Sequence, residues 1–346
     1  MPISYIIEGG DNLRGEVTVG GSQQQAAIAL ISALVTEESV VVRGVPNTQW
    51  IQGLIECLQF VGVSVSRKDS EVTVNAKDIT TTALPANLVS KTPFSILLLG
   101  GLLSRTERVS LEVPQDNYPY DSFQFHRAVF SQGLEGDIRE QDGYISIYGH
   151  ISNSDIVLDY PSPRVSVQAL LAVVSSPKQV TIKNVSAHPD VEFAIRTLQE
   201  RGVEITEHKK GEYIVNSKGD LHGGEVMIRG DIDETVFWAV CAVHTRGELT
   251  IENVSSSDIT PFLSKLTQIG VQFKLEKNSL TLWCEDIKEL SPISIDIKPY
   301  PGIIPEWAGW LLILFNRING TSTLIQTSRL DKMTYLSALK LLSMEI

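Results

Sequence analysis

The chain of 346 residues contains only three cysteines and lacks a long uninterrupted apolar run. Cys57, Cys241 and Cys284 are widely spaced within apolar stretches, which favours neither a disulfide framework nor a metal site and indicates a reducing compartment. The longest apolar segments, residues 95–103 and 307–315, are too short to span a bilayer. The N-terminus also lacks the basic region and apolar run of a signal peptide. We therefore expect a cytoplasmic protein with no membrane segment.

Basic residues are scarce. Lys and Arg together number 29 against 41 Asp and Glu, and the formal net charge of -12 is spread along the chain without a run of either sign. This pattern argues against a nucleic-acid-binding surface and against a polybasic membrane patch. The six histidines show no pair at metal-ligand spacing, so we expect no metal site and no cofactor. An anionic ligand would need a local cluster of Lys or Arg.

The main positive feature is an internal repeat. Five similar blocks begin about 70 residues apart, at Gly15, Asn87, Asp155, Gly224 and Ser294. We expect each block to contain an opening strand, an apolar helix, a second strand, an amphipathic helix and a closing pair of strands. In three blocks a glycine stands where the amphipathic helix would end, namely Gly62, Gly202 and Gly270. The expected unit is therefore βαβαββ.

The expected elements recur at matching places in the blocks. The apolar helices are expected at Gln25–Leu34, Pro93–Leu103, Val167–Val174, Thr235–Val243 and Trp307–Phe315. The strands that follow them are expected at Val40–Val45, Val109–Val113, Val180–Val185, Leu249–Val254 and Thr323–Gln326. This alternation predicts an α/β (α+β) fold with a mixed sheet covered by helices in each domain.

Two of the openings, residues 13–22 and 221–230, match each other better than they match the rest, which indicates duplication of a three-block half. We expect a first domain of residues 22–222 and a second domain of residues 1–21 plus 223–346. The fifth block ends within or just after its second helix, at residues 336–346. We expect an incomplete second domain whose strand edges are covered by rearrangement or by a protein partner, with a truncated gene product as the alternative.

Several segments of the sequence resemble the UDP-N-acetylglucosamine 1-carboxyvinyltransferases, the enolpyruvyl transferases of peptidoglycan synthesis. The similar segments are Ile7–Ser22, Leu30–Leu34, Val42–Pro46, Asp159–Ser162 and Pro299–Gly302. The resemblance covers nearly the whole chain, against a family that is longer at the C-terminus. It implies two domains of three βαβαββ units, each arranged about a pseudo-threefold axis. It also implies UDP-N-acetylglucosamine and phosphoenolpyruvate as substrates.

The resemblance places neutral residues where the family has cations. Gln23 and Gln24 match a Lys-Asn pair that binds phosphoenolpyruvate and the sugar, and Pro93 matches an arginine. A neutral amide cannot give the charge-assisted contact that a phosphate dianion normally receives, and proline has no side-chain donor. Removing one such electrostatic group typically costs about 2.7 to 4 kcal/mol of transition-state stabilisation.

The resemblance also suggests an acid and a base. Asp116, in the loop of residues 112–118, matches the region of the general acid, although an aspartate next to an asparagine is commonly a turn former. In the same loop Tyr118 replaces an arginine of the family. Glu306 matches the aspartate that deprotonates the sugar hydroxyl. Its alternative interpretation is a glutamate favoured by the N-terminal end of a helix.

The nucleotide-binding positions are better retained. Pro119 and Asp121 match a Pro-x-Asp segment that wraps the uracil ring, and Ser162 matches a residue near the diphosphate. For Asp121 and Ser162, turn formation and helix capping are the alternatives. Arg164 replaces a glycine and could add a diphosphate contact or block one, and Arg329 matches an Asn-Arg site or is an ordinary surface residue.

Three hypotheses follow. The chain is a divergent transferase acting on UDP-N-acetylglucosamine, a non-catalytic homologue that binds a UDP-sugar or a protein partner, or a related transferase acting on shikimate 3-phosphate. The missing cations favour the non-catalytic homologue on physical grounds. Shikimate 3-phosphate is the weakest of the three because its transferases also need the lysine after the first strand.

Overall fold

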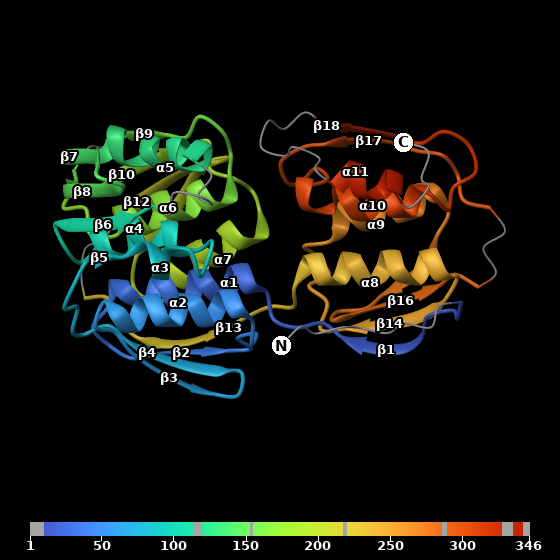
Figure 1. Cartoon of the computed structure of the whole chain (residues 1–346), viewed down its shortest axis with the longest axis horizontal. Coiled ribbons are helices and arrows are strands. Elements are labelled where there is room, and N and C mark those ends of the chain that lie inside the picture. The colour runs from blue at the N-terminus through green and yellow to red at the C-terminus, as the bar shows by residue number, and fades with distance from the viewer. Residues whose placement is uncertain are drawn as a thin grey trace. The chain divides into compact units, whose positions relative to one another are not determined.

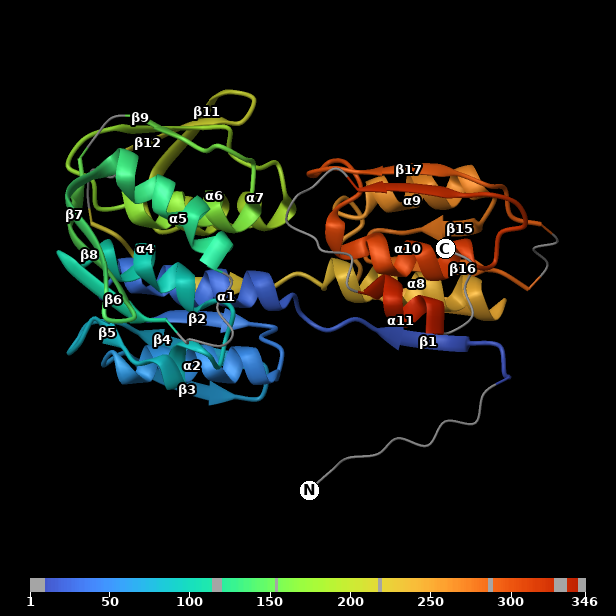
Figure 2. The ribbon, with the colours of Figure 1, turned by 45° about the horizontal axis from the view of Figure 1, so that its top comes forward.

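The computed structural model describes residues 10–113, 120–152, 155–216, 220–285, 289–326 and 335–341. The chain divides into two compact units. One, called the central unit, consists of Gly21–Arg229, and the other, called the terminal unit, consists of Met1–Gly20 and Gly230–Ile346. Figures 1 and 2 show layers of strands and helices within each unit.

The described residues of the central unit form three four-stranded sheets. Their strands are β2 (Val40–Arg43), β3 (Ser64–Lys68), β4 (Glu71–Asn75), β5 (Ala83–Leu84), β6 (Arg108–Glu112), β7 (Leu134–Gln141), β8 (Tyr144–Ile151), β9 (Asp155–Val157), β10 (Val180–Lys183), β11 (Glu204–Lys209), β12 (Glu212–Asn216) and β13 (Gly224–Met227). The sheet orders are β13-β2-β4-β3, β5-β6-β8-β7 and β11-β12-β10-β9. In each sheet the opening strand is parallel to the second, and the remaining pairs are antiparallel. The predicted βαβαββ repeat is therefore confirmed.

Helices connect and cover these sheets. They are α1 (Gln23–Ser32), η1 (Ala33–Val35), α2 (Gln49–Phe60), α3 (Ala86–Val89), η2 (Ser95–Leu97), α4 (Leu98–Leu103), α5 (Tyr120–Gly133), α6 (Pro163–Val173) and α7 (Pro189–Gln199). The apolar helices α1, α4 and α6 lie inside the unit, with α4 buried along its whole length. Small residues permit this packing. A Cβ at Gly100 would lie 2.9 Å from the backbone oxygen of Gln168, and one at Gly101 would lie 2.7 Å from Cγ2 of Ile31.

The described residues of the terminal unit form one four-stranded and one two-stranded sheet. Their strands are β1 (Arg14–Thr18), β14 (Glu248–Glu252), β15 (Gln272–Leu275), β16 (Ser279–Trp283), β17 (Ser294–Ile297) and β18 (Thr323–Gln326), in the orders β1-β14-β16-β15 and β17-β18. The helices are α8 (Ile232–Thr245), α9 (Thr260–Ile269), η3 (Pro305–Trp307), α10 (Ala308–Phe315) and α11 (Tyr335–Leu341). The core includes Trp307, which is fully buried and lies edge-on to Phe262.

The opening strands of the first and fourth repeats are exchanged between the units. Strand β1 pairs in parallel with β14, and β13 pairs in parallel with β2, as Figure 1 shows. These strands lie in the two segments whose sequences match best, residues 13–22 and 221–230. Strand β1 therefore belongs to the terminal unit, although the helix that follows it, α1, belongs to the central unit. In the same way, β13 belongs to the central unit and the helix that follows it, α8, belongs to the terminal unit.

Two expected elements differ from the structure in the second repeat. Its opening strand is β5, and Asn87, expected to begin that block, lies in α3. Pro85 provides an extended N-cap residue, and the backbone N–H of Ala86 donates to Oε2 of Glu112 at 2.9 Å, which stabilises a helix start here. The helix expected from Pro93 starts later, because Pro93 lies in a turn before η2 and α4.

The glycines expected to end the amphipathic helices all adopt positive φ angles. Gly270 is the left-handed C-cap of α9, with φ 94°. Gly62 follows α2 with φ 101°, and Gly202 follows α7 with φ 97°. These are conformations that other residues adopt at a cost. Within the described ranges, no helix has the length and apolar character needed to cross a membrane.

Candidate functional site

The start of α1 is held by the segment that ends the central unit. Ser22 is the N-cap, and its Oγ accepts a hydrogen bond from the N–H of Gln25 at 3.3 Å. The N–H of Ser22 donates to the carbonyl oxygen of Arg229 at 2.9 Å, and the N–H of Arg229 donates to Oε1 of Gln25 at 3.2 Å. The side chain of Arg229 also donates from Nη2 to the carbonyl oxygen of Pro189 at 3.2 Å, which ties this start to that of α7.

Gln23, the first residue of α1, contacts the start of α2. The hydroxyl of Thr48 donates to Oε1 of Gln23 at 2.8 Å. Thr48 is also the N-cap of α2 and accepts a hydrogen bond from the N–H of Ile51 at 3.4 Å. The carboxamide oxygen of Gln23 is therefore occupied, and its nitrogen is the group that can donate to a ligand. Gln24 follows it on α1 and is half-buried, as Gln23 is.

Phe94 joins the starts of α2 and α6. Its ring is 1% exposed, and it lies edge-on to the ring of Trp50, the second residue of α2, with 6.5 Å between the ring centres. The guanidinium carbon of Arg164, the second residue of α6, lies 5.7 Å from the centre of the same ring. A continuous set of contacts thus connects Gln23, through Thr48 and α2, to Arg164.

A buried histidine lies close to Arg164. His126 on α5 is 3% exposed, and burial lowers its pKa to about 3, with the positive charge of Arg164 as a smaller cause in the same direction. Its Nδ1 atom has no hydrogen-bond partner among the residues that the structure describes. His126 is therefore neutral at physiological pH, and Arg164 carries the only positive charge of these two residues.

The helix starts gathered here carry no acidic residue. The first turns of α1, α2 and α6 contain neither Asp nor Glu, whereas those of α7 and α8 do. Ser162, the half-buried N-cap of α6, makes no side-chain capping bond. Helix N-termini carry partial positive charge and free backbone N–H groups, which suit anions. We call this region the central anion face, defined by Ser22, Gln23, Thr48, Phe94, Ser162 and Arg164.

The structure thus brings together three of the residues singled out from the sequence, Gln23, Ser162 and Arg164. Asp121 is the second residue of α5. Asp116, Pro119 and Arg329 lie outside the described residues. Thr48, Trp50, Phe94, His126 and Arg229 were not identified from the sequence, because their places in the site depend on contacts between different elements.

Glu306 belongs to the terminal unit. It is exposed and lies in η3, directly before the buried Trp307 and the start of α10. The indole Nε1 of Trp307 donates to Oδ1 of Asp233 at 2.8 Å, which anchors η3 to the first turn of α8. An exposed carboxylate at this position is compatible with both interpretations of Glu306: a base that accepts a proton from a substrate, and a glutamate that stabilises the start of a helix.

Comparison with solved structures defines the class of the fold. The enolpyruvyl transferase NikO from Streptomyces tendae matches with a TM-score of 0.86 at 20% identity, over 96% of this chain and 80% of that one. EPSP synthase from Acinetobacter baumannii matches with a TM-score of 0.70 at 17% identity, over 92% and 75%. The fold is therefore that of the enolpyruvyl transferases.

Sequence comparison then gives the family. The profile of EPSP synthase (3-phosphoshikimate 1-carboxyvinyltransferase) matches residues 7–334, and the chain belongs to this family. A UDP-N-acetylglucosamine 1-carboxyvinyltransferase from Desulfosudis oleivorans is 27% identical over 99% of this chain and 82% of its own length. A second, from Carboxydothermus hydrogenoformans, is 27% identical over 93% of this chain and 77% of its own length. The resemblance found from the sequence segments is confirmed.

Proposed function

We propose that this protein is a 1-carboxyvinyltransferase that uses phosphoenolpyruvate and the 3-hydroxyl of UDP-N-acetylglucosamine. The names of the related proteins support this substrate class. In the transfer, the sugar oxygen forms a bond to C2 of phosphoenolpyruvate while C3 gains a proton. The resulting adduct then loses a proton from C3 and expels phosphate from C2. The products are the enol ether and inorganic phosphate. Phosphate release is therefore a direct measure of turnover.

The observation that carries the proposal is the position of Arg164. Its guanidinium group lies over the ring of Phe94, the residue next to Pro93. Pro93 matches an arginine in the family, so a cation missing from that position is supplied from the start of α6. A guanidinium group can bind a phosphate or carboxylate with two parallel hydrogen bonds. The loss of charge counted from the sequence is therefore partly offset.

The remaining roles rest on the sequence match. We assign the phosphate groups of the ligands to the central anion face. Glu306 is proposed as the base for the sugar hydroxyl and Asp116 as the acid. Pro119 and Asp121 are assigned to the uracil ring, and Arg329 to a further substrate contact.

A second candidate is a homologue that binds the nucleotide sugar without transfer. One observation favours it: Gln23 is neutral, and its carboxamide oxygen is held by Thr48. A phosphate dianion at the start of α1 would receive hydrogen bonds but no charged partner from this residue. This candidate predicts UDP-N-acetylglucosamine binding without phosphate release.

Calorimetric titration with UDP-N-acetylglucosamine, and separately with shikimate 3-phosphate, tests the substrate class. The proposal predicts saturable binding of the nucleotide sugar and none of shikimate 3-phosphate at the same concentration. Binding of shikimate 3-phosphate alone would assign the chain to the other branch of the family and overturn the proposal.

The cytoplasmic location, the place in peptidoglycan synthesis and the protein partner stay predictions. In the terminal unit, α8 and α10 carry a half-buried aromatic group that would suit such a partner. The ring of Phe237 lies 5.1 Å from that of Trp238 and 5.0 Å from that of Trp310, measured between centres.

A further inference from the structure

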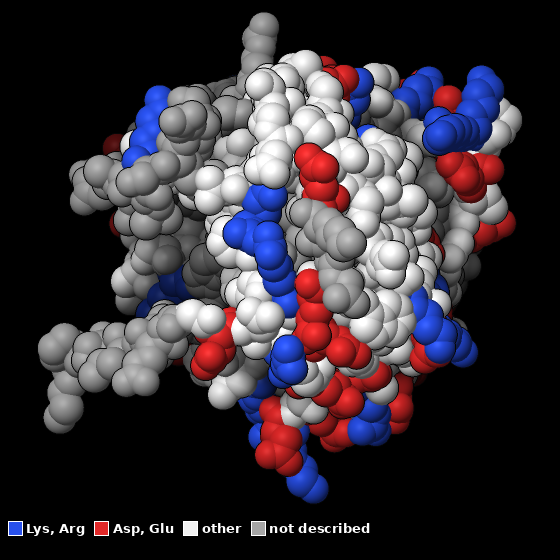
Figure 3. Space-filling view, turned by 90° about the vertical axis from the view of Figure 1, so that its right-hand side faces the viewer, with Lys and Arg blue, Asp and Glu red and all other residues white. Residues whose placement is uncertain are grey.

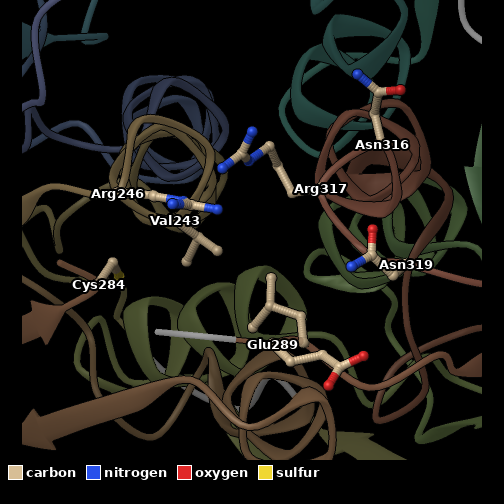
Figure 4. Close-up of a pocket in the computed structure, with 8 residues that line it drawn as sticks. Val243, Arg246, Cys284, Glu289, Asn316, Arg317 and Asn319 are labelled. Carbon is tan, nitrogen blue, oxygen red and sulfur yellow. The ribbon is translucent and has the colours of Figure 1, made fainter. Parts of the chain in front are cut away.

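A pocket of about 150 Å³ lies within the terminal unit, away from any residue assigned above. It forms where the C-terminal ends of α8 and α10 meet the end of β16, as Figure 4 shows. The residues around it are Val243, Arg246, Cys284, Glu289, Leu290, Asn316, Arg317 and Asn319. A water molecule occupies about 30 Å³ in the liquid, so the volume of the pocket is several times that of one water molecule. A tetrahedral oxyanion with a small substituent therefore fits.

Two guanidinium groups share this pocket. Figure 4 shows the side chains of Arg246 and Arg317 pointing toward each other, while the carboxylate of Glu289 lies on the opposite side and points away from them. Among the described residues, neither arginine has an ion-pair partner within 4 Å. Within the described ranges, two like charges therefore face each other without a carboxylate between them.

The described cations of the terminal unit differ in whether a carboxylate lies within 4 Å of them. Some of them have carboxylate neighbours, as in the pairs Arg14–Glu285, Lys274–Glu276 and Lys298–Asp296. Figure 3 shows the same tendency on one face of the molecule, where basic and acidic side chains lie next to each other in several places.

Apart from Glu289, whose carboxylate points away from the two arginines, the described surroundings of the pocket add hydrogen-bond donors. The pKa of His244, on the last turn of α8, is lowered mainly by burial and further by the charge of Arg317. Asn319 is exposed beside the pocket and offers a carboxamide N–H group. The carbonyl ends of α8 and α10 explain why arginines are favoured here, since cations stabilise helix C-termini. They do not explain why two of them converge on one cavity.

We propose that this pocket binds a doubly charged oxyanion of the phosphate class, either free phosphate or the phosphate group of a small ester. The planar forks of Arg246 and Arg317 can each give two parallel hydrogen bonds to such a group. Asn319 supplies a further donor. The site is separate from the central anion face, so it does not depend on the proposed transfer activity.

The test compares two double variants of the full chain by calorimetric titration with inorganic phosphate at constant ionic strength. Arg246→Gln/Arg317→Gln removes both cations of the pocket. Lys274→Gln/Lys277→Gln is the matched control, because it removes two positive charges from exposed positions of the same unit. The proposal predicts unchanged affinity in the control and at least a tenfold loss at one site in the pocket variant.

Phosphate bound at the central anion face would persist in the pocket variant, so the difference between the two variants isolates this site. Equal phosphate binding by the wild type and both variants, or no binding by the wild type, would overturn the proposal. If the double variant does not fold, Asn319→Asp gives an independent test, since it adds a negative charge at an exposed position. We expect it to weaken phosphate binding about tenfold.

Titration with glycerol 3-phosphate distinguishes the two sources of the anion. Tighter binding of this ester than of inorganic phosphate assigns the site to a small phosphate ester. Equal affinities assign it to the phosphate group alone. A pocket variant that loses phosphate binding but still binds UDP-N-acetylglucosamine keeps this inference separate from the proposed function.

Discussion

The guanidinium carbon of Arg164 lies 5.7 Å from the centre of the Phe94 ring, so the charged group at the start of α6 is placed beside the turn that contains Pro93. Such a cation–π contact contributes about 0.5 to 1 kcal/mol at an exposed site. It is enough to favour one position of a long side chain. The sequence alone counts Pro93 as a lost cation, whereas the structure shows another cation next to it.

Arg164→Gln should weaken binding of UDP-N-acetylglucosamine or phosphoenolpyruvate by about tenfold or more. A hydrogen bond to a charged group typically contributes about 1.5 to 3 kcal/mol, and glutamine cannot replace the charge. Arg196→Gln is the matched control, because Arg196 lies over Phe193 at 5.9 Å in the same unit but on α7. Titration calorimetry measures both. Equal losses in the two variants would indicate a general charge effect instead of a site at α6.

Gln23→Lys should increase the affinity for phosphoenolpyruvate. The substitution adds a positive charge at the start of α1, beside Thr48, where a phosphate dianion can use it. Gln52→Lys adds the same charge at an exposed position of α2 and serves as the control. We expect an increase of about tenfold in the first variant and less than about twofold in the second. No difference between them would argue against a phosphate group at the start of α1.

His126 should make the folded protein less stable as the pH falls from 6.5 toward 5. Its pKa is about 3 in the folded state, against 6.5 for an unperturbed histidine, so only the unfolded chain binds a proton in this range. Stability is fully present above pH 6.5 and decreases by about 1.4 kcal/mol per pH unit below it. From pH 6.5 to pH 5 the expected loss is about 2 kcal/mol.

Denaturant unfolding of the His126→Phe variant at several pH values measures this contribution. The variant should lose the part of the pH dependence that comes from His126. His208→Gln, a change at an exposed histidine on β11, should keep the wild-type dependence. The account of His126 is wrong if the His126→Phe variant and the wild type lose stability in parallel between pH 6.5 and 5.

Gly21→Ala should lower the free energy of unfolding by about 2 kcal/mol, since a Cβ at residue 21 would overlap the carbonyl oxygen of Gly44. At Gly20, a Cβ would meet only the flexible carboxylate of Glu234, at 3.3 Å. Gly20→Ala should therefore be the milder change. Thermal unfolding of both variants checks this order, and the reverse order would mean that the backbone at Gly21 can shift freely.

Much of the fold could be predicted from the sequence because local patterns determine it. The alternation of strands and helices, the β-branched strands and the glycines after α2, α7 and α9 all follow from short-range chemistry. Strand Thr323–Gln326 was predicted with the bounds of β18. The predicted start of the second repeat, at Asn87, was wrong. A strand as short as Ala83–Leu84 has no periodicity to recognise, and a helix with Pro85 as its N-cap follows directly after it.

The candidate site could be predicted only in part. Gln23, Ser162 and Arg164 could be named as candidates from the sequence because each follows a repeat opening that can be aligned, and their roles stay predictions. Thr48 could have been identified as an N-cap from its place before α2. Its contact with Gln23, and that of Arg164 with Phe94, join residues of different elements, and no spacing rule along the chain indicates such contacts.

The most direct test of the proposed function is phosphate release in the presence of both UDP-N-acetylglucosamine and phosphoenolpyruvate, measured for the wild type and for Glu306→Gln. We predict release that requires both substrates and falls by at least about a hundredfold in the variant, as expected for loss of a general base. Binding of UDP-N-acetylglucosamine without any phosphate release by the wild type would contradict the transferase proposal and identify a nucleotide-sugar-binding homologue.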